Sequence, residues 1–170
     1  MNKDKYIEIF KKTGALLEGH FVLTSGRHSS SYFQCAKVLQ YPQYLSQFSK
    51  EIIKELSTEL EVDKVISPAV GGIVLGTEVG RLLNKPTIFA ERMNGKMSLR
   101  RGFKIDKNEK ILVVEDVITT GGSVKEVIDV AHKNHGQVVG VGIIVDRSNG
   151  QVKIHAVSYT HLRAHETRTY

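Results

Sequence analysis

Two acidic side chains and a turn of small residues follow one apolar run of the chain. Glu115 and Asp116 come directly after four apolar residues at 111–114, and residues 119–123 (TTGGS) follow. Backbone N–H groups in such a turn, together with the positive end of a helix, bind phosphate. Carboxylates accept hydrogen bonds from sugar hydroxyls. The order of residues therefore predicts a site for a phosphorylated sugar at the end of a buried strand.

The glycine pair alone is also typical of an ordinary strand-to-helix turn. Combined with the acidic pair, the turn resembles the 5-phosphoribosyl-1-pyrophosphate (PRPP) motif of type I phosphoribosyltransferases. The resemblance implies that Asp116 takes part in catalysis. It also implies that PRPP is bound by Glu115, Asp116, Val117, Ile118, Thr119, Thr120, Gly121, Gly122 and Ser123.

A second turn of small residues, 68–72 (PAVGG), follows the segment 62–67 (VDKVIS), which we expect to be a core strand. By itself it is a weak signal for an anion site at a helix N-terminus. Its place one strand–helix unit before the PRPP-like motif corresponds to the pyrophosphate loop of the family. The resemblance implies that Gly71 and Gly72 lie beside pyrophosphate, in a loop that often carries a non-proline cis peptide.

The polar segment 24–29 (TSGRHS) could be a solvated hairpin turn. Followed by Tyr32 and Phe33, it resembles the hood of the orotate phosphoribosyltransferase family, in which an aromatic pair lies near the pyrimidine. Thr24 stands where better-known members carry a lysine. Arg27 or His28 could supply that charge, although His28 also fits a surface turn.

Residues 91–103 are basic, contain two glycines and lack a clear apolar period. They fit either a β-hairpin with a solvated basic face or the mobile catalytic loop of the family. Positive charges placed in advance stabilise a departing pyrophosphate. On the second interpretation Arg92 and Lys96 are catalytic, and Arg100 and Arg101 are weaker candidates. The loop has no histidine between Arg92 and Phe103, unlike that of better-known members.

Asp146 and Arg147 end the apolar run 137–145. They could form a surface ion pair. In the orotate family the matching arginine contacts the orotate carboxylate, and an arginine can bind a carboxylate through two parallel hydrogen bonds. The resemblance therefore assigns orotate to Arg147, Thr119, Tyr32 and Phe33.

Length and composition narrow the class of protein. The 170 residues suit one domain, and 41% hydrophobic and 25% charged residues are ordinary for a globular protein. No run of 18 apolar residues indicates a membrane span, and a single cysteine excludes an internal disulfide. We therefore expect a cytoplasmic protein without membrane contact. The net charge of +6 comes without a nucleic-acid motif, which favours polyanionic small molecules as partners.

Apolar spacing predicts helices over residues 4–12, 44–60, 72–83 and 124–134. It predicts strands over 21–23, 32–38, 62–67, 86–90, 111–114, 137–145 and from 151 onward. The alternation indicates an α/β fold, with a mostly parallel central sheet flanked by helices and a small N-terminal hood. We expect one domain over 1–158, with the hood at 14–40 and the core at 60–158.

The last twelve residues, YTHLRAHETRTY, show neither strand nor helix periodicity. They resemble translated sequencing-adapter read-through, so we expect 159–170 to be a non-native tail.

Together these resemblances imply transfer of the phosphoribosyl group from PRPP to orotate, giving orotidine 5′-monophosphate and pyrophosphate for pyrimidine synthesis. They also imply Mg²⁺ held mainly by PRPP, and a homodimer in which the 92–101 loop reaches the neighbouring site. A purine-base phosphoribosyltransferase and a PRPP-sensing transcription regulator are the alternatives. The hood and the Asp-Arg-Ser at 146–148 disfavour the first, and the lack of an added DNA-binding segment disfavours the second.

Overall fold

The computed structural model describes residues 3–22, 28–56, 58–148 and 158–161. In chain order the elements are α1 (Lys3–Lys12), β1 (Leu16–Val22), β2 (His28–Phe33), α2 (Cys35–Leu39), α3 (Pro42–Glu55), β3 (Lys64–Pro68), α4 (Gly71–Leu83), β4 (Thr87–Met93), β5 (Lys96–Leu99), β6 (Lys110–Ile118), α5 (Gly122–Lys133), β7 (Gln137–Asp146) and β8 (Ser158–His161).

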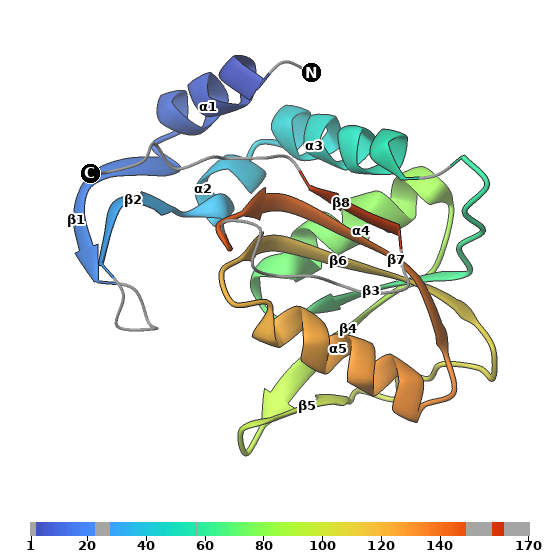
Figure 1. Ribbon diagram of the computed structural model, residues 1–170. Coiled ribbons are helices and arrows are strands. Elements are labelled where there is room, and N and C mark those ends of the chain that lie inside the picture. The colour runs from blue at the N-terminus through green and yellow to red at the C-terminus, as the bar shows by residue number, and fades with distance from the viewer. Residues whose placement is uncertain (1–2, 23–27, 57, 149–157, 162–170) are drawn as a thin grey trace.

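The main sheet has the strand order β5-β4-β3-β6-β7-β8. All neighbouring strands are parallel except β4 and β5, which form an antiparallel hairpin. The strands β1 and β2 form a separate antiparallel pair that stands apart from the main sheet (Figure 1). The predicted α/β fold with a mostly parallel sheet and an N-terminal hood is confirmed.

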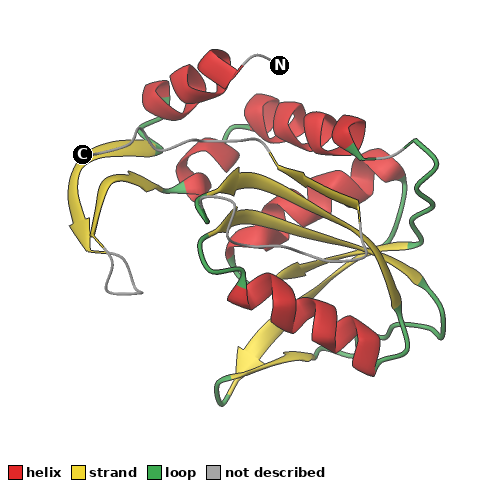
Figure 2. Cartoon of the chain, in the orientation of Figure 1, coloured by secondary structure: helices red, strands yellow, loops and turns green. Residues whose placement is uncertain are grey.

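Helices cover both faces of the main sheet (Figure 2). On one face α4 packs against β3, β4 and β6, and α3 packs against α4; on the other face lies α5. Successive strand residues point to opposite faces, so Leu112 and Val114 join the cluster under α3 and α4, whereas Ile111 and Val113 join the cluster under α5. Burial on both faces explains why the run 111–114 is continuously apolar.

Several predicted boundaries are wrong. The strand expected over 21–23 already begins at Leu16, as β1. The expected strand over 32–38 ends at Phe33, and α2 begins at Cys35. Cys35, Val38 and Leu39 are all buried, and their i, i+3, i+4 spacing suits a helix better than a strand. The expected helix over 44–60 begins earlier, with Pro42 in its first turn, and ends at Glu55, because Leu56 has an extended backbone.

The C-terminal end bears on two predictions. Most of the strand expected from residue 151 lies outside the described residues, as does 162–170. Residues 158–161 form β8, which pairs parallel with β7. Three residues of the expected non-native tail thus lie in the sheet, and whether the tail is native stays a prediction. Within the described parts of the chain, no helix is long and apolar enough to span a membrane.

Candidate active site

The turn between β6 and α5 forms a small pocket of about 60 Å³. Gly121 immediately precedes the helix with φ +74°, a left-handed conformation that favours glycine. No side chain caps the first turn of α5, so its N–H groups can donate to an anion. The structure thus gathers around one pocket the predicted residues Glu115, Val117, Ile118, Thr119, Thr120, Gly121, Gly122 and Ser123, joined by Val124.

The acidic pair lies within β6 rather than after it, because the strand continues to Ile118. Glu115 and Asp116 are only 7% and 9% exposed. Glu115 Oε1 accepts a hydrogen bond from the Asp116 N–H at 3.1 Å, and Asp116 Oδ1 accepts one from the Val117 N–H at 2.9 Å. Each carboxyl therefore uses one oxygen to fix its own orientation on the strand.

The turn between β3 and α4 lies against this acidic pair. A methyl group added at Gly71 would come within 2.9 Å of Asp116 Oδ2, and one at Gly72 within 3.1 Å of Glu115 Oε1. Glycine at these two positions therefore leaves room for the close approach of the two segments. The Ala69–Val70 peptide bond in this turn is cis, as the family resemblance implied. The two turns expected to bind PRPP lie side by side because β3 and β6 are neighbouring parallel strands.

The electrostatics of the acidic pair are shaped by burial. Burial raises the pKa of the Glu115 carboxyl well above its usual range, and the hydrogen bond and charge of Asp116 raise it further. A protonated Glu115 can donate a hydrogen bond as well as accept one. The pair therefore offers a sugar both kinds of partner.

Cys35 contacts the acidic strand from the hood side. Its Sγ lies 3.9 Å from the carbonyl oxygen of Asp116. Burial, together with the charges of Asp116 and Glu115, raises the pKa of this thiol. A protonated thiol is a weak donor, so Cys35 serves as a packing contact between α2 and β6.

Arg147 joins the end of β7 to the hood. Its backbone N–H donates to the carbonyl of Ile118 at 2.9 Å, and its Nη2 donates to the carbonyl of Ser31 at 3.1 Å. Its guanidinium carbon lies 5.7 Å from the centre of the Phe33 ring, a cation–π distance. The predicted orotate residues Arg147 and Phe33 are therefore in contact.

Tyr32 faces away from that contact, because neighbouring residues of a strand point to opposite sides. It is 37% exposed, lies 5.7 Å from the Phe21 ring and donates from its hydroxyl to Gln34 Oε1 at 3.1 Å. Phe33 is buried and packs edge-on against Phe10 at 5.5 Å. The structure does not bring the two predicted aromatics together on one face.

Residues 91–99 of the basic segment lie in the β4–β5 hairpin, and the role of the segment as the catalytic loop stays a prediction. Arg92 pairs with Glu126 of α5, with Nη2 2.6 Å from Oε2. Arg101 pairs with Glu91 through Nε at 3.0 Å and Nη2 at 3.2 Å, and it also lies over the Phe89 ring. Lys96 begins β5 and is exposed. Arg92 and Lys96 thus lie on the hairpin strands, whereas Arg100 and Arg101 directly follow β5.

Several hood predictions lie beyond what the structure covers. Thr24 and Arg27 fall in the undescribed segment 23–27. His28 is exposed, and its Nδ1 lies 2.6 Å from Nε2 of His20 on the paired strand. Sequence analysis did not single out His20, Glu126 or Cys35. The partners of Glu126 and Cys35 are remote in the chain, and the partner of His20 lies across a bulged strand pair.

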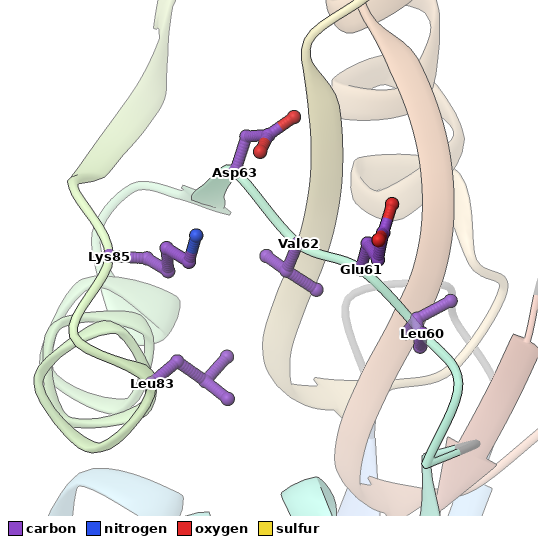
Figure 3. A pocket seen from close by; sticks show the side chains of 6 residues that line it. All are labelled: Leu60, Glu61, Val62, Asp63, Leu83 and Lys85. Carbon is purple, nitrogen blue, oxygen red and sulfur yellow. The ribbon is translucent and has the colours of Figure 1, made fainter.

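A larger pocket of about 420 Å³ lies at the amino ends of the parallel strands. It precedes β3 and follows α4, and Figure 3 shows the Lys85 side chain reaching into the space beside Val62 and Asp63. Ligands of open parallel sheets bind at the carboxyl ends of the strands. This pocket at the amino ends is therefore separate from the candidate active site.

The chain is similar to proteins of known family. Residues 40–166 match the profile of the phosphoribosyl transferase domain. Orotate phosphoribosyltransferase from Chlorobium phaeobacteroides is 60% identical over 154 residues, which are 91% of this chain and 79% of that protein. The protein of the same name from Caldicellulosiruptor bescii is 54% identical, with 91% and 80% covered.

Solved structures agree with the sequence relatives. The crystal structure of orotate phosphoribosyltransferase from Aeropyrum pernix superposes with a TM-score of 0.73 at 27% identity, covering 92% of this chain and 91% of the other. Adenine phosphoribosyltransferase from Thermoanaerobacter pseudethanolicus has a TM-score of 0.71 at 12% identity, covering 92% and 98%, and shows the fold alone. The match over residues 40–166 shows a phosphoribosyl transferase domain, and the identity to these relatives shows that the chain belongs to the orotate phosphoribosyltransferase family.

Proposed function

We propose that the chain transfers the 5-phosphoribosyl group of PRPP to orotate, giving orotidine 5′-monophosphate and pyrophosphate in de novo pyrimidine synthesis. The observation that carries the proposal is that two glycine turns and an acidic pair meet at the carboxyl ends of β3 and β6. The choice of orotate as the acceptor follows from the relatives at 53–60% identity, which are named orotate phosphoribosyltransferase.

The β6–α5 turn holds the 5′-phosphate in this proposal. Residues 119–123 provide N–H groups and hydroxyls, and the positive end of α5 attracts the anion. Val117 and Ile118 line the same pocket. Glu115 and Asp116 bind the ribose hydroxyls, because their buried oxygens are already oriented along the strand. Good orientation before binding reduces the entropy that the reaction must lose.

Pyrophosphate lies at the β3–α4 turn beside Gly71 and Gly72, where the backbone approaches within contact of the acidic pair. Arg92 and Lys96 stabilise the negative charge that develops as the bond between ribose and pyrophosphate breaks. Orotate lies between Arg147 and the Thr119 end of the phosphate turn. Arg147 binds the orotate carboxylate and Phe33 supports the guanidinium. Tyr32 lies on the other face of β2, so its predicted contact with orotate is not part of this arrangement.

Mg²⁺ is the cofactor that we propose for the reaction. Among the described residues, no group of three or more histidine, cysteine or acidic side chains could hold a metal ion. Glu115 and Asp116 each commit one oxygen to the main chain, so this donor set suits sugar hydroxyls better than direct metal ligation. The ion would therefore be held mainly by PRPP. When bound, it supplies charge neutralisation on the pyrophosphate and ribose oxygens.

Two further parts of the proposal concern the setting of the enzyme. We propose a homodimer in which the 92–101 segment reaches the neighbouring site, and location in the cytoplasm. The exposed half of the hairpin supports the first, because Arg92, Lys96 and Arg100 all keep access to solvent. Sedimentation equilibrium would test the dimer, and a monomer with full activity would contradict it.

An assay of purified protein with PRPP, Mg²⁺ and a panel of bases tests the reaction. We expect pyrophosphate release with orotate and none with adenine, guanine or xanthine. Release with a purine alone would establish the purine-base alternative. PRPP-dependent operator binding without turnover would establish the regulator instead. Comparing the full chain with a form ending at Ser158 shows whether residues 159–170 contribute to activity.

A further inference from the structure

The chain leaves the main sheet directly after β7, which ends at Asp146. The Arg147 N–H still donates to the Ile118 carbonyl at 2.9 Å, and Ile118 is paired with Asp146 across β6 and β7. The next N–H, that of Ser148, donates instead to Asp146 Oδ1 at 2.7 Å. An aspartate oxygen that accepts from the backbone N–H two residues on forms an Asx turn. The Asp146 carboxylate therefore provides the acceptor at the point where the chain leaves the sheet.

These two hydrogen bonds hold the backbone on both sides of Arg147. The peptide unit before Arg147 is held through its own N–H, and the peptide unit after it is held through the Ser148 N–H. A residue has only two soft backbone dihedrals, one on each side of its Cα atom. Holding both peptide units therefore sets the direction in which the Arg147 side chain leaves the backbone, and Asp146 supplies the second of the two restraints.

That direction matters because Arg147 joins two parts of the candidate site. Its backbone is bonded to Ile118, which lines the phosphate pocket together with Thr119. Its guanidinium reaches the hood, where Nη2 donates to the Ser31 carbonyl at 3.1 Å. The guanidinium carbon lies 5.7 Å from the centre of the Phe33 ring. Contacts therefore place the backbone of this arginine at the phosphate turn and its charged end at the hood.

We propose that Asp146 is a positioning residue for the acceptor site, which holds Arg147 in the orientation that receives the carboxylate of orotate. The assignment rests on the proposed function, and in it Asp146 itself binds neither substrate. Two-point binding of a carboxylate needs the guanidinium in one plane and one direction, so a change in the backbone at Arg147 weakens both hydrogen bonds. Asp146 therefore affects the affinity for orotate and not the affinity for PRPP.

The KM values of Asp146→Ala and Asp146→Asn test the assignment. We expect Asp146→Ala to raise KM for orotate about tenfold, since misplacement of a binding group is costly, and to change KM for PRPP less than about twofold. Asparagine keeps an oxygen that accepts from the Ser148 N–H, although more weakly, so Asp146→Asn should raise KM for orotate less than about threefold. Thermal unfolding shows whether each variant folds. If alanine prevents folding, Asp146→Ser takes its place, because its hydroxyl forms the same turn more weakly.

A double-mutant cycle with Arg147→Gln separates positioning from a direct contact with orotate. Glutamine has no charged fork for a carboxylate, so KM for orotate rises in this variant whatever the turn does. In the Arg147→Gln background, Asp146→Ala should have no further effect on KM for orotate, because Asp146 acts only through Arg147. Effects of the two substitutions that multiply independently would overturn the assignment.

Asp63→Ala is the matched control. Asp63 Oδ2 also accepts from a backbone N–H, that of Lys110 at 2.9 Å, but at the amino ends of β3 and β6. We expect this variant to keep both KM values of the parent. An unchanged KM for orotate in Asp146→Ala, an equal rise in both KM values, or an asparagine variant as impaired as the alanine variant would overturn the assignment while leaving the reaction intact. A parent protein that releases no pyrophosphate with orotate would overturn the proposed function as well.

Discussion

The β6–α5 turn and the surroundings of Arg147 both lie at the carboxyl ends of the parallel strands. The turn is built from adjacent residues, whereas the surroundings of Arg147 are built from residues far apart in the chain. Nine consecutive residues, 115–123, provide the acidic pair and the phosphate turn. The Arg147 guanidinium instead contacts the Ser31 carbonyl, 116 positions away in the chain, and the Phe33 ring. One part is local, and the other forms only when the hood docks on the core.

This difference has a consequence for function. The part proposed to bind the ribose and the 5′-phosphate depends on the conformation of β6 and of the turn that follows it. The base part depends on contacts between Phe33, Phe10 and Phe48, which anchor the hood to α1 and α3. Substitutions in the hood core should therefore alter orotate binding while leaving PRPP binding unchanged.

We expect the largest effect on kinetics from a substitution in the acidic pair, which belongs to the part built from adjacent residues. Asp116→Asn keeps the shape of the side chain but removes its charge, and hydrogen bonds to charged groups are about twice as strong as neutral ones. We expect kcat/KM for PRPP to fall about 100-fold with an unchanged circular dichroism spectrum. Asp129→Asn, on an exposed position of α5, is the control. Unchanged kinetics would remove Asp116 from the site.

Glu115 tests the electrostatics of the same part. Its pKa is raised in the folded protein, so the folded state keeps a proton that the unfolded chain loses above its ordinary pKa of 4.5. The stability that this group contributes is complete below that pH and is lost as the pH rises toward the folded pKa. Glu115→Gln should therefore gain stability relative to the parent by up to about 1.4 kcal/mol per pH unit above that point.

Urea unfolding between about pH 5 and pH 9 would measure this difference. A difference between the two proteins that does not change with pH would show that Glu115 is ionised in the folded state. The acidic pair would then bind sugar hydroxyls as two acceptors.

Arg147→Lys tests the assembled part. Lysine keeps the charge but loses the planar fork that binds a carboxylate at two points. We expect KM for orotate to rise about tenfold while KM for PRPP changes less than about twofold. Arg81→Lys on α4 provides the comparison, since its partner Glu78 lies outside the site. An equal rise in both KM values would show that the two parts are not separate.

Phe33→Leu has the smallest expected effect. The shorter side chain leaves space beside Phe10 and removes the ring under Arg147, so the free energy of unfolding should fall by about 1 kcal/mol. KM for orotate should rise about threefold, since the cation–π contact contributes about 0.5–1 kcal/mol. Tyr32→Phe, on the other face of the strand, should change stability much less. A larger effect at Tyr32 would place the base on the outer face of the hood.

Much of the fold was predictable because its signals are local. The run 111–114 is apolar throughout, and the helix and strand over residues 122–146 follow from spacing and from a glycine stop. The errors fall where a short segment has two possible periods. The short run 32–38 was predicted as a strand, whereas Cys35, Val38 and Leu39 have helical spacing and are all buried against the core.

The basic segment 91–103 is a second case in which the sequence allows two structures. Its sequence allows a hairpin or an irregular loop, because Arg92, Lys96 and Arg101 carry no apolar period. Pairing with β4 and packing of Met97 and Leu99 on α5 select the hairpin. Glu126 had no local signal at all, since its partner Arg92 is 34 residues away.

The sequence by itself predicted a phosphate turn beside an acidic pair, because that prediction depends on residue types that are adjacent in the chain. Only the tertiary structure decided that Gly71 and Gly72 contact that pair, that Phe33 rather than Tyr32 lies under Arg147, and that Glu126 pairs with Arg92. These contacts depend on which strands are neighbours and which face of each element is buried. Packing of the whole chain determines both the strand neighbours and the buried faces, so neither can be predicted from a local sequence pattern.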